Sequence, residues 1–222
     1  MRAERASSFL DRRHRVIFNW VWDTPWFSKN GNSVVRNVLG NYTFTGTYTY
    51  ESPQYATVQS GVDSNLNLDA ATDRAIVNVD GIPNTGSGVI PIDRNGNMID
   101  AGKAGIVAYV ARDPSAQYIV AGLGALATGG RQTLATRPIN NWDVQIKKQF
   151  LLGETRRLQF AAQFFNWFNH PQYIPGYLNN VQLRESRGTR NNLIPSHPDF
   201  NRPDRVYPSN ARAVQLVVRY QF

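Results

Sequence analysis

The chain has 222 residues, a formal net charge of +8 and no cysteine. The absence of cysteine excludes disulfides and thiolate metal sites, and no run of about 18 apolar residues offers a transmembrane helix. A basic chain can bind nucleic acid, but the arginines are scattered from Arg2 to Arg219, with no dense run after the first fifteen residues. The pattern favours solvated surface arginines, and no nucleic-acid partner is expected.

The N-terminal fifteen residues are rich in arginine and lack the apolar segment of a secretory signal. Since an exported protein needs such a signal, we expect the true N-terminus to lie upstream of Met1.

Two long strands are predicted in the first quarter of the chain. Residues 14–23 alternate with period two, and residues 39–60 alternate again, with threonines on one face and aromatics on the other until Pro53 interrupts. The segment 24–37 between them contains Pro25 and an Asn-Gly-Asn group, which predicts a turn.

Three further strands are predicted at 141–150, 157–168 and 212–222. Residues 151–156 form a tight turn. Lys148 falls on the apolar face near a strand end, where its stem could let the ammonium snorkel.

The remaining segments, 61–137 and 169–211, are long, polar and without clear periodicity. Short turns that alternate with long loops are typical of a transmembrane barrel, which has short periplasmic turns and long extracellular loops. The sequence therefore predicts an all-β fold, made of antiparallel strands of an outer-membrane β-barrel. With about five long strands, the barrel would be incomplete.

Several stretches resemble a known family. They are DRRHR (11–15), VLGNYTFTG (38–46), SGVDSN (60–65), NNWDVQIKKQF (140–150) and RLQFAAQFFNWFNHPQY (157–173). Together with the aromatic C-terminus, they resemble the C-terminal barrel of TonB-dependent receptors, specifically the Oar-like transporters of the Acidobacteria type. The resemblance covers nearly the whole chain.

The resemblance implies a barrel of about 22 strands with a plugged lumen, of which residues 1–222 would be a C-terminal fragment, inactive alone, in the bacterial outer membrane. It implies as partners the remainder of the barrel and its plug, outer-membrane lipid, the barrel-assembly machinery, an unidentified ligand and, through the missing N-terminal part, TonB. No cofactor is implied.

The last strand carries the sharpest functional signal. Its apolar face ends on a terminal phenylalanine and resembles the signal that barrel-assembly machinery reads; a plain final strand of a soluble sheet is the alternative. The residues concerned are Val214, Leu216, Val218, Tyr220 and Phe222.

Aromatic side chains recur on the apolar faces of the other strands. They are expected to face lipid or to form interfacial girdles. They are Phe18, Trp20, Trp22, Tyr42, Phe44, Tyr48, Trp142, Phe160 and Phe164. For Trp20, Trp22, Phe160 and Phe164, packing in a core and stacking on sugars are the alternatives.

No catalytic, cofactor-binding or metal-ligating residue is predicted. Asp and Asn alternate at 63–69 and 93–100 as in a calcium loop, but neither run has both the glycine and the glutamate that an EF-type loop needs. The three histidines, His14, His170 and His197, are far apart, and the glycine-rich run 122–130 lacks a P-loop ending. The chain is not expected to be an enzyme, and a secreted or surface β-sandwich binding module is the alternative to the receptor.

Overall fold

A computed structural model describes residues 5–8, 10–70, 73–173 and 191–222. The chain forms two compact units. The sheet unit comprises residues 12–52, 138–172 and 209–222, and the loop unit comprises residues 1–11, 53–137 and 173–208. No described helix combines the length and the apolar character required to cross a bilayer.

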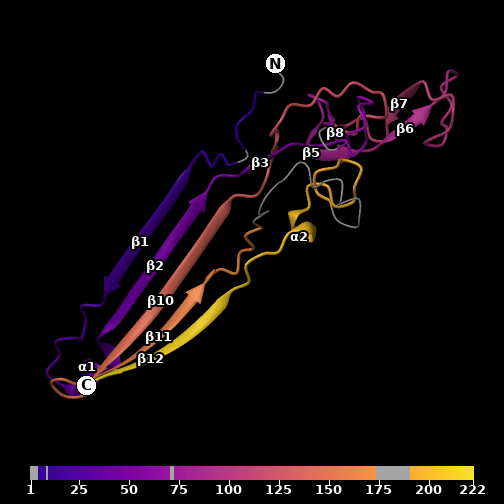
Figure 1. Ribbon diagram of the computed structural model, residues 1–222. Coiled ribbons are helices and arrows are strands. Elements are labelled where there is room, and N and C mark those ends of the chain that lie inside the picture. The colour runs from indigo at the N-terminus through magenta and orange to yellow at the C-terminus, as the bar shows by residue number, and fades with distance from the viewer. Residues whose placement is uncertain (1–4, 9, 71–72, 174–190) are drawn as a thin grey trace. The chain divides into compact units, whose positions relative to one another are not determined.

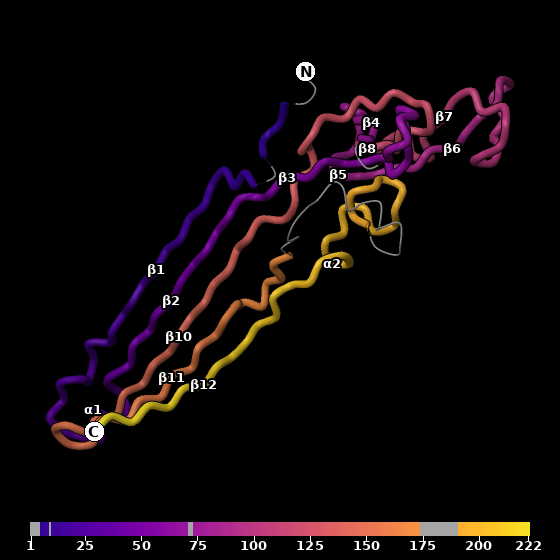
Figure 2. The backbone as a smooth tube through the Cα atoms, in the orientation of Figure 1, coloured from indigo at the N-terminus to yellow at the C-terminus, as the bar shows by residue number. Residues whose placement is uncertain are grey.

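The sheet unit is a single antiparallel sheet of five strands in the order β1-β2-β10-β11-β12 (Figures 1 and 2). These are β1 (Arg15–Asp23), β2 (Tyr42–Glu51), β10 (Ile139–Leu151), β11 (Arg157–Phe165) and β12 (Ala213–Gln221). Within the described part of the chain, β1 and β12 each pair with one strand, so the sheet is not closed into a barrel. The predicted all-β, antiparallel fold class is confirmed.

The second strand is shorter than predicted. The expected strand 39–60 spans only Tyr42–Glu51, because Leu39 belongs to a helix at its start. At its end Ser52 N still donates to His14 O at 2.8 Å, but the next residue, Pro53, has no N–H for a ladder. The continuation β3 (Tyr55–Ala56) pairs instead with β9 (Leu134–Ala135) in the loop unit.

The predicted turn at 24–37 contains a helix that the periodicity did not indicate. Helix α1 (Ser33–Leu39) begins after Asn32, whose side chain accepts hydrogen bonds from Val34 N at 2.9 Å and Val35 N at 3.3 Å. This is a standard N-cap, which satisfies N–H groups that the helix cannot bond internally.

The third and fourth strands also differ from prediction at their ends. Strand β10 runs from Ile139 to Leu151 instead of 141–150. Strand β11 ends at Phe165 instead of 168, because Asn166 takes a left-handed conformation, φ 53°, that a strand cannot continue.

The predicted long loop 61–137 contains short strands, which together with β3 form three small sheets. They are β3 with β9; β4 (Ile76–Val77), β8 (Ala116–Ile119) and β5 (Ile82–Ser87); and β6 (Val89–Ile92) with β7 (Ala108–Ala111). The second long loop, 169–211, contributes the short helix α2 (Pro203–Val206), and its residues 174–190 lie outside the described residues.

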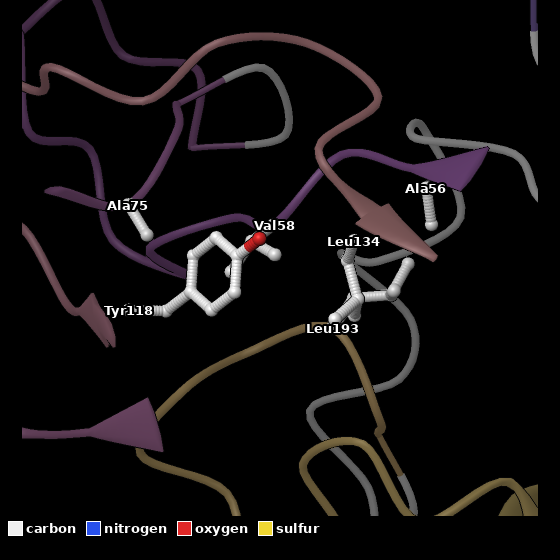
Figure 3. Close-up of a cluster of buried hydrophobic side chains, with 6 residues drawn as sticks. All are labelled: Ala56, Val58, Ala75, Tyr118, Leu134 and Leu193. Carbon is white, nitrogen blue, oxygen red and sulfur yellow. The ribbon is translucent and has the colours of Figure 1, made fainter. Parts of the chain in front are cut away.

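A small hydrophobic cluster holds the loop unit together (Figure 3). Its six buried members are Ala56, Val58, Ala75, Tyr118, Leu134 and Leu193. The Tyr118 ring lies beside Val58, and Leu134 lies against Leu193. The cluster joins residues from both long connections, so the two predicted loops fold together.

Buried polar groups supplement this small core. The Asp73 carboxylate, 5% exposed, accepts hydrogen bonds from Ser64 N at 2.5 Å and from Asn65 N and Nδ2 at 3.2 and 2.8 Å. Such hydrogen bonds offset the desolvation penalty of a buried carboxylate. They also hold residues 64 and 65 in place, where few apolar side chains are available for packing.

Candidate functional site

The pairing register of the sheet unit places every even-numbered strand residue on one face. Phe18 lies opposite Tyr48, and Tyr48 lies opposite Trp142. Directly opposed residues of an antiparallel pair point to the same side of the sheet. The same parity continues through β11 and β12, where Ala162 lies opposite Leu216. We call this side the even face.

The even face is apolar across all five strands. Its members on β1 and β2 are Val16, Phe18, Trp20, Trp22, Tyr42, Phe44, Gly46, Tyr48 and Tyr50. On β10 and β11 they are Asn140, Trp142, Val144, Ile146, Lys148, Phe150, Leu158, Phe160, Ala162 and Phe164. On β12 they are Val214, Leu216, Val218 and Tyr220.

Aromatic rings meet at the strand ends near the two short turns. Trp22 stacks on Phe44 with ring centroids 5.6 Å apart. Phe150 meets Phe160 edge to face at 5.9 Å. Tyr220 stacks on the terminal Phe222 at 6.0 Å. These contacts form one aromatic band at the turn end of the even face.

A second aromatic band lies at the opposite ends of the strands, where the long connections leave the sheet. Tyr48 and Trp142 are 4.5 Å apart, and Trp142 meets Phe168 at 6.2 Å. Phe164 meets Trp167 at 4.6 Å. Trp167 and Phe168 lie beyond the end of β11, where the sequence analysis did not single them out.

Between the bands the even face contains one glycine, the half-buried Gly46, which is covered by an indole. A Cβ added to Gly46 would lie 2.5 Å from the Trp20 ring. Gly46 therefore lets Trp20 lie flat across β2, and the indole covers backbone that a glycine would otherwise leave open.

All nine aromatics singled out from the sequence lie on the even face. The structure brings Tyr42 within 6.4 Å of Phe44, in addition to the pairs above, and places Phe18 in one cross-strand row with Tyr48 and Trp142. Their lipid-facing role remains a prediction.

Much of the even face is open to the surroundings in the isolated chain. Phe18 is 56% exposed and Leu216 78% exposed. A contiguous exposed apolar surface of this kind marks contact with another apolar phase or partner. In a β-sandwich such a face would be covered by a second sheet.

The odd-numbered face is mostly polar and carries side-chain hydrogen bonds between strands. Thr43 Oγ1 donates to Asp23 Oδ1 at 2.5 Å, and Thr47 Oγ1 donates to Asn19 Oδ1 at 2.8 Å. Its apolar exceptions include Ile17 and Val21 on the edge strand β1, Phe165 on β11 and Val217 on β12. The two faces thus have opposite polarity.

Lys148 is the one charged residue on the even face. Its ammonium lies 4.0 Å from the centroid of the Tyr42 ring and donates hydrogen bonds to Val38 O at 3.2 Å and to Gly40 O. A cation–π contact and backbone carbonyls satisfy the charge on this otherwise apolar face. Lys148 is 9% exposed and its ammonium is buried against these carbonyls at the turn end of the sheet, instead of reaching water as the predicted snorkelling would place it.

The sequence analysis missed a polar corner where three strands end. Asn166, 3% exposed, donates from Nδ2 to His170 O at 3.0 Å and to Asn210 O at 2.8 Å, while its Oδ1 accepts from His170 N. Its own N–H donates to Asp143 at 2.9 Å. This corner ties the end of β11 to β10 and to the chain entering β12.

Gln172 extends the same corner. Its side chain accepts from Asn140 N at 2.6 Å and donates to Asn140 O at 2.6 Å, and its N–H donates to Asn210 Oδ1 at 2.9 Å. Asn166, His170 and Gln172 belong to the FNWFNHPQ stretch (165–172), and the other residues of the corner are its hydrogen-bond partners. In the sequence this stretch contributed only to the family resemblance. The hydrogen bonds show what its polar residues do: they hold the ends of the strands together.

The Asp and Asn runs considered as calcium loops bond to their own backbone. Asp63 accepts from Asn67 N at 3.0 Å and Leu68 N at 2.7 Å. Asp93 accepts from Asn97 N and Asn95 N at 2.8 Å, and the Asn97 hydrogen bond leads in lowering the pKa of this carboxyl below its ordinary value. Among the described residues no group of three acidic or histidine side chains is arranged to hold a metal.

The three histidines are not brought together by any described contact. His14 N donates to Ser52 Oγ at 3.0 Å, His170 Nδ1 lies 2.9 Å from Gln172 Nε2, and His197 Nδ1 accepts from Asp199 N at 3.0 Å. Each histidine therefore has a local structural partner.

Comparison with known proteins identifies one family. Residues 1–194 match the family model of the outer membrane beta barrel domain. No curated protein and no solved structure matches the chain. The match spans four of the five long strands, and the sheet it covers has one apolar and one polar face. The chain belongs to the outer membrane beta barrel domain family and is a protein of the bacterial outer membrane.

Proposed function

We propose that the chain forms wall strands and extracellular, ligand-facing loops of a TonB-dependent, Oar-like receptor that transports a solute across the outer membrane. The observation that supports it most strongly is the continuous even face with an aromatic band at each end. The sequence resemblance supplies the finer assignment to this class of receptor.

The dimensions of the even face suit a bilayer. From Tyr42 to Tyr50 the strand β2 makes eight steps, or about 27 Å at ~3.4 Å per residue. With a strand tilt of roughly 40°, this corresponds to about 20 Å across the membrane, close to the apolar band of ~25 Å in outer-membrane barrels. We assign the even face to lipid and the two aromatic bands to its interfacial girdles.

The polar odd face would then line the lumen, where side chains such as Thr47 and Asn19 would meet water or a plug. The open edges of β1 and β12 need partners, because unpaired backbone groups are costly in lipid. We propose that further strands of the same barrel supply them, and that a plug on that longer protein contacts TonB. No catalytic role is proposed.

The receptor assignment predicts a plugged barrel. The native outer-membrane protein that carries this sequence, reconstituted in planar bilayers, is expected to show no steady ion conductance and to be captured by the periplasmic domain of TonB. A steady open-pore conductance without TonB capture would contradict the receptor and indicate a porin-like barrel.

The proposed assembly signal in β12 predicts a defect when its aromatic end is removed. Phe222 is 94% exposed and stacks on Tyr220, so truncating it should leave the sheet intact while removing a recognition feature. Phe222→Ala is expected to lower the heat-modifiable, folded protein in outer membranes several-fold. Gln221→Ala is the matched control, and equal amounts for both variants would argue against the signal.

The β-sandwich binding module is not favoured. A soluble module would have to cover the even face, and Val214, Leu216 and Val218 are all more than half exposed.

A further inference from the structure

The connection from β1 to β2 is more than a turn. Residues 24–41, which we call the rim segment, include α1 and begin with Thr24 N donating to Tyr42 O at 2.9 Å. Two side chains of the even face reach its C-terminal part: Tyr42 donates from its hydroxyl to Val38 O at 3.3 Å, and Lys148 donates to Val38 O and Gly40 O. The rim segment is therefore attached on the even-face side of the strand ends.

The rim segment exposes large apolar side chains. Trp26, Phe27, Val34, Val38 and Leu39 are between 49% and 66% exposed. The Trp26 ring meets Trp22 of the even face edge to face at 5.3 Å, so this apolar surface continues the aromatic band at the turn end without a break.

The charge of the rim segment is of one sign. Residues 24–41 contain Lys29 and Arg36 and no acidic residue. Exposed Trp, Phe and aliphatic side chains with basic residues are the composition of segments that lie in the headgroup layer of a membrane and are attracted to anionic lipid.

The rim segment is held in a fixed position. Asn37 binds the backbone of Leu151 from both ends of its amide, with Nδ2 donating to Leu151 O at 3.1 Å and Oδ1 accepting from Leu151 N at 3.0 Å. Gly40 packs so tightly that an added Cβ would lie 2.9 Å from backbone atoms of Phe27 and Ser28. Because the segment is fixed, its exposed apolar side chains cannot turn inward, and they need an apolar contact from outside the segment.

We propose that the rim segment is an interfacial anchor that lies in the phospholipid headgroup layer at the turn end of the sheet and binds anionic glycerophospholipids. This inference rests on the proposed lipid-facing role of the even face. It adds a membrane contact outside the wall strands, at the level where the ammonium of Lys148 meets the backbone of α1.

Residues 1–222 contain no cysteine, so a labelling test needs only the replacement by serine of any cysteine elsewhere in the native protein. Single cysteines at Val38, at Glu154 in the other short turn and at Leu216 on the even face carry an environment-sensitive fluorophore in the native protein reconstituted in vesicles. The vesicles contain phosphatidylcholine with or without phosphatidylglycerol. Separate samples carry a headgroup-level nitroxide lipid, which reports on positions 38 and 154, or an acyl-chain nitroxide lipid, which reports on position 216. Val38→Cys is expected to be blue-shifted and quenched, more strongly with phosphatidylglycerol, and Glu154→Cys to remain water-exposed and weakly quenched.

The three positions separate the possible failures. Quenching of Leu216→Cys without quenching of Val38→Cys would overturn the anchor alone, and a blue-shifted but unquenched Val38→Cys would point to a protein cover instead of lipid. Absence of lipid quenching at Leu216→Cys would overturn the wall assignment itself. Equal quenching of Val38→Cys with and without phosphatidylglycerol would overturn the preference for anionic lipid.

Discussion

Ile146→Arg is expected to destabilise the assembled protein by about 2–4 kcal/mol, the cost of an arginine near the bilayer midplane on the lipid face of a barrel. Ile146 lies on the central strand β10, opposite Phe44 on one side and Ala162 on the other. It is midway between Trp142 and Phe150, so a guanidinium there is far from either headgroup layer. The measurement is the urea dependence of the heat-modifiable folded band in vesicles.

Gln145→Arg is the matched control, because residue 145 is the next on the same strand and lies on the odd face opposite Thr45 and Gln163. It loses the hydrogen bond from Thr45 Oγ1 at 3.2 Å, and its charge would face the lumen, so a loss of less than about 1 kcal/mol is expected. A larger penalty for Gln145→Arg than for Ile146→Arg would mean that the faces are assigned the wrong way round.

Asn166→Ala is expected to cost about 1–3 kcal/mol beyond the backbone effect. The substitution removes three hydrogen bonds of a side chain that is 3% exposed: those donated to His170 O and Asn210 O and the one accepted from His170 N. Each such bond contributes about 0.5–1.5 kcal/mol net. Because the corner joins the ends of β10, β11 and β12, the loss should also increase protease sensitivity where the long connections begin.

Asn169→Ala separates this effect from backbone strain. Asn169 has φ 52°, almost equal to the φ 53° of Asn166, but it is exposed and accepts one hydrogen bond, from Arg212 N at 3.1 Å. Replacing asparagine by alanine in this left-handed region costs roughly the same at both positions. Equal urea midpoints for the two variants would show that the buried hydrogen bonds of Asn166 contribute little.

The strands could be predicted because successive residues of a strand point to opposite faces, so a sheet with one apolar face requires alternating apolar and polar residues. Tyr42 to Glu51 illustrate this, with aromatics on one side and threonines on the other. The end of β2 was harder to predict, because the alternation of apolar and polar residues resumes at Tyr55 after Pro53. Only the backbone pairing in the structure shows that Tyr55 pairs with Ala135 in another sheet.

The polar corner and the loop unit could not be predicted from local patterns. The contacts of Asn166 depend on Asp143 and Asn210, which are 23 and 44 residues away in the sequence. In the loop unit, Asp73 is fixed by backbone N–H groups at 64 and 65, and such side chain–backbone bonds have no period. Helix α1 has seven residues, too few for a clear helical repeat.

Strand β12 offers a pair of identical residues that tests whether the even face meets lipid and the odd face does not. Val217 lies opposite Ala161 on the odd face, and Val218 lies opposite Phe160 on the even face. With single fluorophore-labelled cysteines in vesicles containing an acyl-chain nitroxide lipid, Val218→Cys is predicted to be strongly quenched and Val217→Cys weakly. Equal quenching at the two positions, or the reverse order, would contradict the account.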